Sequence, residues 1–318
     1  MTIKISVHLV TYNSADPIEM CLDSLLGQQG VDFGVLVVDN ASTDDTVARV
    51  QKKGVEVVVN SENWGYSAAH NLAISRTQSD YVLTLNPDVW LAPGYLATMV
   101  GTLDENPKLG SAAGLLLRVE KLGETPQWID STGLLMSRSR RQLLRNSGDP
   151  VAKTPLQSDA VFGPDGAAAI YRRAMLEDIA INGEIFDEDF FMHKEDVDVC
   201  WRAQLRGWQS LYVPEAVGHH IRGFRPGQRE RVSADMRFLG VRNRYLLMLK
   251  NEIMPHFWRD APAILWYDLK IWGFILLKER SSLRAFRSVW QLRKRMMAKR
   301  RVIQAGRKVE WRDLRKFF

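Results

Sequence analysis

The sequence predicts an α/β protein with a mostly parallel sheet flanked by helices, followed by a basic α-helical region. In the first hundred residues, apolar runs of strand length alternate with helical stretches. Each run is apolar at successive positions, so the sheet should be covered on both faces, as parallel sheets are. After residue 227 the chain changes to helices rich in Trp, Leu, Arg and Lys. We therefore divide it into residues 1–226 and 227–318.

The expected elements follow in order along the chain. Strands are predicted at 3–10, 33–39, 55–59 and 81–85. Helices are predicted at 16–27, after Thr43 and at 66–75, the second having Ser42 or Thr43 as a cap and acidic residues in its first turn. Residues 109–171 read as less regular. A helix should begin at Glu195, with short strands near Leu211 and Val217.

The composition is that of a folded globular protein, with 46% apolar and 25% charged residues in 318. Cys21 and Cys200 are too far apart for a metal motif and should be reduced packing residues. The first residues lack the apolar stretch of a signal peptide. The longest apolar stretch, 261–277, is interrupted by Asp268 and Lys270 and falls short of a membrane span of ~18 residues. We expect a cytoplasmic protein.

Charge is divided unevenly between the two regions. Residues 1–221 hold 18 Lys and Arg against 29 Asp and Glu, a net charge of −11, and residues 222–318 hold 25 against 8, a net charge of +17. A basic region on an acidic body indicates an anionic partner: a phospholipid surface, a nucleic acid or a phosphate-bearing acceptor. The chain shows no nucleic-acid-binding module, so we expect no nucleic acid as partner.

Polar residues follow each predicted strand. They are Thr11, Tyr12 and Asn13 after the first, Asp39 and Asn40 after the second, Asn60, Asn63 and Gly65 after the third, and Asn86, Pro87 and Asp88 after the fourth. Turns also favour these residue types. However, the carboxyl ends of parallel strands share one edge, where α/β proteins bind ligands. The absence of G-x-G-x-x-G and P-loop patterns disfavours nicotinamide enzymes and P-loop NTPases.

Six motifs together resemble a known family. VTYNS, VVDNASTDDT, NWGYSAAHN, LNPDV, FDEDFFMHKEDVDVCWR and VPEAVGHHIRG occur in this order. They resemble the inverting glycosyltransferases of family 2, which have the GT-A fold, and especially their bacterial rhamnosyltransferase-like branch. The resemblance covers residues 3–225 and continues more weakly through VRNRYLLMLKN. It implies metal-dependent transfer of a sugar from a nucleotide donor to an acceptor hydroxyl.

The resemblance also implies roles on the donor side. Asp39 would bind the base or ribose, Thr11 and Asn13 would line that pocket, and Asn63 and Asn71 would shape the cleft. Asp88 would bind Mg²⁺ or Mn²⁺, although Asn86 replaces the first carboxylate of the usual D-x-D. His220, or its neighbour His219, would complete the metal site. Arg222 and Arg225 could hold the diphosphate, or could equally be a solvated loop.

The resemblance assigns the catalytic base to Asp196, in KEDVD. Inverting transfer needs one carboxylate to take the acceptor proton. Glu195 and Asp198 should raise the pKa of Asp196 by like-charge repulsion, although acids at a helix N-terminus also stabilise the helix dipole. Trp201 and Leu205 should pack inward and Arg202 should hold an acid or a phosphate. The candidates for the acceptor side are Trp128, Asp130, Asp165 and Glu195.

The basic region combines aromatic residues with cations. The aromatic residues are Trp258, Trp266, Trp272, Phe274, Phe286 and Trp290, and the cations include Arg293, Lys294, Arg295, Lys299, Arg300 and Arg301. Such helices suit the inner face of a cell membrane, or they could pack on the catalytic domain or form a homodimer.

The expected donor is dTDP-L-rhamnose, by resemblance, and the acceptor a saccharide or lipid-linked glycan in polysaccharide synthesis. The alternatives are a UDP-hexose or galactofuranose donor, or a non-catalytic sugar-nucleotide or lipid-binding protein.

Overall fold

The computed structural model describes residues 3–121, 123–153, 156–221 and 232–318. A ten-stranded sheet forms its base, with a path of β10-β12-β6-β11-β4-β1-β2-β3, β5 beside β12 and β7 beside β6. The predicted strands are confirmed as β1 (Ile5–Thr11), β2 (Phe33–Asp39), β3 (Glu56–Val59) and β4 (Tyr81–Leu85). These four pair in parallel, so their carboxyl ends share one edge.

The remainder of the sheet is mixed. β11 (Ala168–Arg172) runs antiparallel to both β4 and β6 (Leu109–Arg118). β12 (Gln209–His220) runs parallel to β6 and is one continuous strand, where two short ones were expected. Its register shifts between Val213 and Val217, around Pro214, because proline has no N–H to donate to a ladder. The minor strands are β5 (Val89–Leu91), β7 (Trp128–Ser131), β8 (Leu134–Met136), β9 (Gln142–Leu144) and β10 (Asp159–Ala160).

Helices cover both faces of the sheet, which explains the uninterrupted apolar strands. Side chains of Val7 and Leu9 face α1 and α4, whereas Val10 faces α3 on the opposite side. The helices of this region are α1 (Ala15–Leu26), α2 (Thr46–Lys52), α3 (Gly65–Arg76), α4 (Tyr95–Glu105), α5 (Arg173–Ile179) and α6 (Glu195–Leu205). The helix expected at Glu195 is therefore confirmed.

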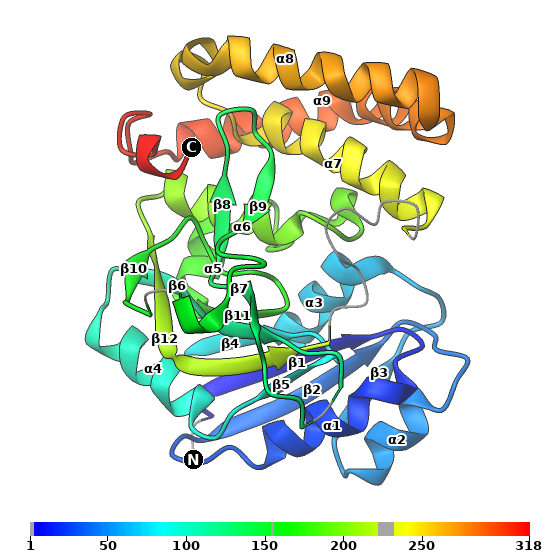
Figure 1. Ribbon diagram of the computed structural model, residues 1–318, viewed down its shortest axis with the longest axis vertical. Coiled ribbons are helices and arrows are strands. Elements are labelled where there is room, and N and C mark those ends of the chain that lie inside the picture. The colour runs from blue at the N-terminus through cyan, green and yellow to red at the C-terminus, as the bar shows by residue number, and fades with distance from the viewer. Residues whose placement is uncertain (1–2, 122, 154–155, 222–231) are drawn as a thin grey trace.

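Three long helices form a layer above α6 (Figure 1). They are α7 (Ala234–Asn251), α8 (Met254–Lys278) and α9 (Arg284–Ala305). α7 and α9 share an apolar core with α6, which includes Trp201, Leu246, Met296 and Ile303. α8 lies outermost (Figure 1). Among the residues described, no helix combines the length and apolar character needed to cross a bilayer.

Candidate functional site

The polar residues that follow β1 and β2 form a hydrogen-bonded group at the carboxyl edge of the sheet. Asp39 is fully buried at the end of β2. Its Oδ1 accepts hydrogen bonds from the hydroxyls of Thr11 (2.7 Å) and Ser42 (2.6 Å), and its Oδ2 accepts one from the Ser42 N–H (2.8 Å). These donors hold the carboxylate in one orientation, against the loop that follows β2.

Asn13 joins the loops after β1 and β2. Its Oδ1 accepts a hydrogen bond from the Thr43 N–H at 2.9 Å, and its own N–H donates to Ser42 Oγ at 2.8 Å. Asn13 has a φ of +50°, in the left-handed region that Asn tolerates better than most residues. The amide of Asn40 similarly donates to the Gly65 carbonyl and accepts from Asn60. The strand ends therefore converge, as the sequence predicted.

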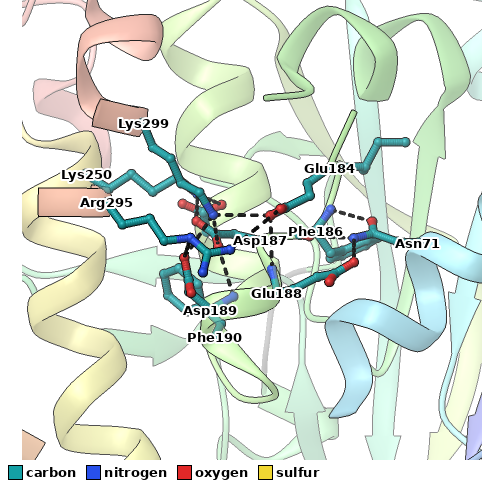
Figure 2. Close-up of polar contacts among 12 residues, drawn as sticks. Asn71, Glu184, Phe186, Asp187, Glu188, Asp189, Phe190, Lys250, Arg295 and Lys299 are labelled. Carbon is teal, nitrogen blue, oxygen red and sulfur yellow. Dashed lines mark hydrogen bonds and ion pairs between the residues drawn. The ribbon is translucent and has the colours of Figure 1, made fainter. Parts of the chain in front are cut away.

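The side chains of Asn63 and Asn71 form hydrogen bonds with backbone groups in and around α3. Asn63 Oδ1 accepts a hydrogen bond from the Gly65 N–H at the start of α3. Asn71 accepts from the Phe186 N–H (2.9 Å) and donates to the Phe186 carbonyl (2.7 Å), and it also reaches Glu188 (Figure 2). Asn71 thereby ties α3 to the acidic segment before α6.

The segment after β4 carries Asn86 and Asp88. The hydroxyl of Tyr66, on α3, donates to Asn86 Oδ1 (3.2 Å) and to the Gly166 carbonyl (3.1 Å). Asp88 Oδ1 is buried, has no hydrogen-bond partner among the described residues and lies 3.4 Å from His220 Nε2. This oxygen can therefore accept a further ligand beside His220, at the end of β12.

His220 lies between two carboxylates. Its Nδ1 bonds to Asp130 Oδ2 at 2.8 Å, and its Nε2 faces Asp88. Burial lowers the pKa of His220, but its hydrogen bond to Asp130 and the nearby carboxylate of Asp88 raise it to about 9 overall. A carboxylate that fixes one imidazole nitrogen while the other faces a ligand is the arrangement that orients metal-binding histidines.

His219 points to the opposite side of β12, because side chains alternate along a strand. It stacks on Trp90, with ring centroids 5.0 Å apart and planes at 8°. Of the two adjacent histidines, His220 is therefore the one that faces Asp88.

The donor set of Asp88 and His220 fits a divalent cation that also binds phosphate. In the part of the chain that the structure describes, no three His, Cys, Asp or Glu side chains form a cluster able to hold a metal by themselves. Mg²⁺ typically uses one or two protein carboxylates and completes its coordination with water and substrate phosphate. The unpartnered Asp88 oxygen beside the fixed imidazole agrees with such a shared site.

Asp196 is the second residue of α6 and is almost fully buried. Its Oδ2 accepts a hydrogen bond from the Gly166 N–H (3.1 Å) and its Oδ1 accepts one from the Val197 N–H (2.7 Å). Burial, followed by the charge of Asp165, raises the pKa of Asp196 to about 6. Such a carboxyl group is mostly ionised at neutral pH and is a stronger base than an exposed aspartate.

Glu195 and Asp165 complete the acidic group. Glu195 is buried, and its Oε2 has no hydrogen bond among the described residues. Burial, and then the charge of Asp196, raises the pKa of Glu195 to about 8. Asp165 accepts a hydrogen bond from the Ala167 N–H within the loop that meets Asp196. Two of the acceptor-side candidates are therefore adjacent to Asp196.

The expectation that Asp198 raises the pKa of Asp196 was wrong. Asp198 is on the far side of α6, where its carboxylate bonds to Arg202 (2.8 Å), Lys250 (2.8 Å) and Asn251 (2.8 Å). Residues two apart on a helix do not share a face. Trp201 and Leu205 pack inward and Arg202 holds an acid, as expected.

The other two acceptor-side candidates, Trp128 and Asp130, differ in their exposure to solvent. Trp128 is 44% exposed and lines a cavity of about 390 Å³ together with Arg118, Glu120, Glu124, Gln127 and Gly148. Asp130 is fully buried, between His220 and Arg118, so it has no surface for an acceptor. Arg222 and Arg225 lie outside the described residues.

Comparison with known proteins decides the family. The profile described as "Glycosyl transferase family 2" matches residues 6–180, more than half of the chain. The chain belongs to glycosyl transferase family 2. It is 29% identical to the Mycobacterium tuberculosis N-acetylglucosaminyl-diphospho-decaprenol L-rhamnosyltransferase, over 69% of this chain and 77% of the relative.

Solved glycosyltransferases share the GT-A-like fold. Staphylococcus aureus TarS 1-349 in complex with UDP-GlcNAc has a TM-score of 0.58 at 19% identity, covering 96% of this chain and 91% of that one. The mannosyltransferase PcManGT from Pyrobaculum calidifontis, in complex with GDP-Man and Mn²⁺, has a TM-score of 0.56 at 16% identity, covering 96% and 86%. Each of these two neighbours holds a nucleotide sugar, and PcManGT also holds Mn²⁺.

The basic region of this glycosyltransferase is partly neutralised by the acids of FDEDFF. Lys299 of α9 contacts Asp187 (2.5 Å), Asp189 (3.0 Å) and Glu184 (3.2 Å), and Lys250 of α7 contacts Asp187 at 2.5 Å (Figure 2). Lys299 is buried and therefore unavailable to a membrane, contrary to its inclusion among the lipid-binding cations. Phe286 is half-buried, because it packs against Tyr245 and Trp272, so it offers less surface to a membrane than the other aromatic residues of its group.

Sequence reasoning missed several residues of the site. Tyr66, which links Asn86 to Gly166, was read only as part of a helix. Arg242 and Asn243 of α7 contact the turn before Asp196. The available signal was the extension of the family resemblance through VRNRYLLMLKN, which contains both residues.

Proposed function

We propose that the protein transfers a sugar, with inversion, from a nucleoside diphosphate donor to an acceptor hydroxyl, with Asp196 as the catalytic base. The observation that carries this is the position of Asp196. Its buried carboxylate accepts a hydrogen bond from the N–H of Gly166, and the hydroxyl of Tyr66 links the loop of Gly166 to Asn86. The base and the metal-facing segment after β4 are thus built into one hydrogen-bonded unit.

The proposed donor side is the carboxyl edge of β1 and β2. Exposed Asn13 would contact the nucleoside there, whereas Asp39 and Thr11, contrary to their expected direct contact, are fully buried and would shape the loop around it. Asn63 and Asn71 act indirectly, since both bind backbone groups around α3. Asp88 and His220 would hold the Mg²⁺ or Mn²⁺, and Asp130 would keep the His220 ring in place. When bound, this ion would offset the negative charge that develops on the departing diphosphate.

In the reaction, the acceptor oxygen bonds to the anomeric carbon from the face opposite the diphosphate, and the bond from that carbon to the diphosphate breaks. Asp196 takes the proton that the acceptor hydroxyl loses. Its pKa of about 6 leaves it ionised at neutral pH. Glu195, with a pKa of about 8, carries a proton under the same conditions and so leaves Asp196 as the base.

The proposed donor is dTDP-L-rhamnose, supported by the likeness to a mycobacterial rhamnosyltransferase. Calorimetric titration of dTDP-L-rhamnose, UDP-galactose, UDP-N-acetylglucosamine and GDP-mannose, each with Mn²⁺, tests this choice. Tight binding of a UDP sugar without heat from the dTDP sugar would overturn it. Release of nucleoside diphosphate from the bound donor separates an enzyme from a non-catalytic binding protein of the same fold.

The proposed acceptor is a glycan on a lipid carrier, as the name N-acetylglucosaminyl-diphospho-decaprenol L-rhamnosyltransferase indicates for that relative. Exposed Trp128 and the cavity shared with Arg118 would receive it, since aromatic faces and guanidinium groups suit sugars and phosphates. A lipid carrier would place the reaction at a membrane surface. Transfer to a lipid-linked glycan, and none to the same glycan without lipid, would support this acceptor.

Helix α8 supports peripheral attachment to the inner face of the membrane, because it exposes large apolar side chains while it buries charged ones. The side chains facing the protein include Asp260 and Asp268, which pair with Arg140 and Arg244. The outward side chains are large and apolar: Trp258, Leu265, Trp266, Leu269, Trp272, Phe274, Leu276 and Leu277, each 44–79% exposed. A water-facing helix normally has the reverse pattern.

An anionic bilayer fits this surface. Exposed cations on α8 and α9, such as Lys270, Lys294 and Arg301, flank the apolar side chains and would each add about 1 kcal/mol near anionic lipid. Co-sedimentation with anionic and neutral vesicles, at low and high salt, tests the proposal. Binding should need anionic lipid and weaken with salt. A protein that stays in solution but is dimeric would show instead that a second copy covers α8.

A further inference from the structure

The turn that leads into Asp196 has a strained backbone that two regions of the chain hold from opposite sides. Phe191, His193 and Lys194 have φ values of +65°, +73° and +77°, which non-glycine residues rarely adopt. α6 begins at the next residue, and the Asp198 N–H donates to the Lys194 carbonyl. Any shift of this turn therefore moves the N-terminus of α6, where Asp196 is located.

On one side the turn rests on α3. The Ser67 N–H donates to the Phe191 carbonyl at 3.1 Å. Gly65 packs so closely that a Cβ there would lie 2.5 Å from that oxygen and from the Phe191 ring.

On the other side the turn is held by two consecutive residues of α7. The fully buried Asn243 places its Nδ2 within reach of the carbonyls of Phe190 (3.0 Å), Met192 (2.9 Å) and His193 (2.6 Å). Arg242 donates to the carbonyls of Asp189 (2.8 Å) and Phe190 (2.9 Å), and its Nε donates to Asn243 Oδ1 (2.9 Å). The convergence of these carbonyls on one amide requires the left-handed residues between them.

The ion cluster beside the turn fixes the segment that precedes it. Lys250 and Lys299 contact Asp187, and Lys299 and Arg295 contact Asp189 (Figure 2). Although burial by itself raises the pKa of Asp187, the two lysines hold it well below the usual range. The charged side chains fix the start of the acidic segment, and the Arg242–Asn243 pair fixes its end.

We infer that Arg242 and Asn243 are positioning residues for transfer: α7 holds the 190–194 turn in the conformation that places Asp196. This inference rests on the proposed function of Asp196. It assigns the C-terminal helices a role in building the active centre, separate from any role at a membrane.

The test compares Asn243→Ala and Arg242→Ala with the control Arg237→Ala. Arg237 is also on α7, where it pairs with Glu279 at 3.5 Å, away from the turn. Nucleoside diphosphate release is followed with dTDP-L-rhamnose, or with UDP-N-acetylglucosamine if the wild-type protein turns over that donor. We expect Asn243→Ala to lower kcat at least tenfold with donor KM within threefold, and to shift the acidic limb of the kcat–pH profile. Arg237→Ala should lower Tm without changing kcat.

Hydrogen exchange supplies a readout that does not depend on activity. In Asn243→Ala the amides of Ser67, Met192 and Asp198 should exchange faster, and in Arg237→Ala they should not. If their protection is unchanged, or if kcat stays within twofold of wild type, the inference is wrong. If Asn243→Ala does not fold, Arg242→Lys is compared with Arg242→Ala. Lysine retains a hydrogen-bond donor, so Arg242→Lys should keep activity that Arg242→Ala loses. Equal activities of these two variants would overturn the inference. Should Asp196→Asn be active, the proposed base fails, while the exchange result still reports on the turn.

Discussion

Helices α6 and α8 both bury carboxylates, but in opposite surroundings. In α6, Asp196 accepts hydrogen bonds from two backbone N–H groups, and burial with Asp165 raises its pKa to about 6. In α8, Asp260 meets three arginines, which hold its pKa well below the usual range although burial alone raises it. A buried acid surrounded by cations stabilises the fold. A buried acid without that compensation costs stability, and such groups gather at functional sites.

The largest effect is expected from Asp196→Asn. Loss of a general base typically lowers kcat by ~10²- to 10⁴-fold, while donor affinity by calorimetry should remain. Since the base must be ionised, wild-type kcat should fall as the pH drops through about 6. A purified variant with near-normal kcat would show that another group takes the proton.

The stability of the same variant checks the environment of α6. The folded pKa of Asp196 lies above its unfolded value, so its ionised form destabilises the protein at high pH, and this penalty disappears as the pH falls below the unfolded pKa. Asp196→Asn should therefore have an equal or higher Tm than wild type at pH 7.5. The difference should shrink towards pH 4, and a lower Tm at pH 7.5 would contradict the assigned environment.

Asp260→Ala should show the reverse behaviour. It removes one of the two carboxylates that pair with buried Arg140, the other being Glu252, and should lower the free energy of unfolding, measured by urea denaturation, by about 3 kcal/mol. The kcat per folded molecule should stay near normal, because Asp260 contacts arginines of the β8–β9 hairpin and α8 and none of the site residues. Full stability in this variant would mean that its ion pairs contribute little.

A further pair of variants tests the different roles of the adjacent residues His219 and His220. His220→Ala should lower Mn²⁺- or Mg²⁺-dependent transfer and weaken metal binding by calorimetry, whereas His219→Ala should lose only its stacking on Trp90. Asp130→Asn should weaken metal binding by about 10- to 100-fold, as is typical when the carboxylate behind a metal-binding histidine is removed. Activity that persists after exhaustive EDTA treatment would remove the metal from the mechanism.

The smallest effect should distinguish exposed from buried cations in α9. Lys294→Gln should weaken binding to anionic vesicles by about fivefold, corresponding to roughly 1 kcal/mol, and leave Tm unchanged. Lys299→Gln should lower Tm, since its ammonium lies among Asp187, Asp189 and Glu184, and leave vesicle binding unchanged. Trp266→Ser should weaken vesicle binding more than Trp64→Ser, a matched exposed tryptophan on the catalytic region. Equal effects of the two tryptophan variants would show that α8 is not the lipid-binding face.

Local pattern alone determined the first four strands, the helix at Glu195 and the gathering of polar residues after the strands. These follow from apolar periodicity, and parallel pairing then brings the carboxyl ends to one edge. The resemblance of motifs added the family. Asp88 and His220 were named from that resemblance, Asp88 by its place in LNPDV and His220 by its place in VPEAVGHHIRG.

Tertiary structure decided which charges face which. The sequence shows Asp196 and Asp198 as equivalent acids and Lys294 and Lys299 as equivalent cations. In the fold, Asp198 bonds to Lys250 while Asp196 bonds to backbone N–H groups, and Lys299 is buried against Asp187 while Lys294 is exposed. Asp130 contacts His220 across a sequence separation of 90 residues, and Asn243 contacts the turn at 190–193 across a separation of about 50 residues. Such contacts depend on how helices and strands pack, and the distance between two residues in space has no fixed relation to their separation in the sequence. The roles of buried polar groups therefore became visible only when the helices were in place.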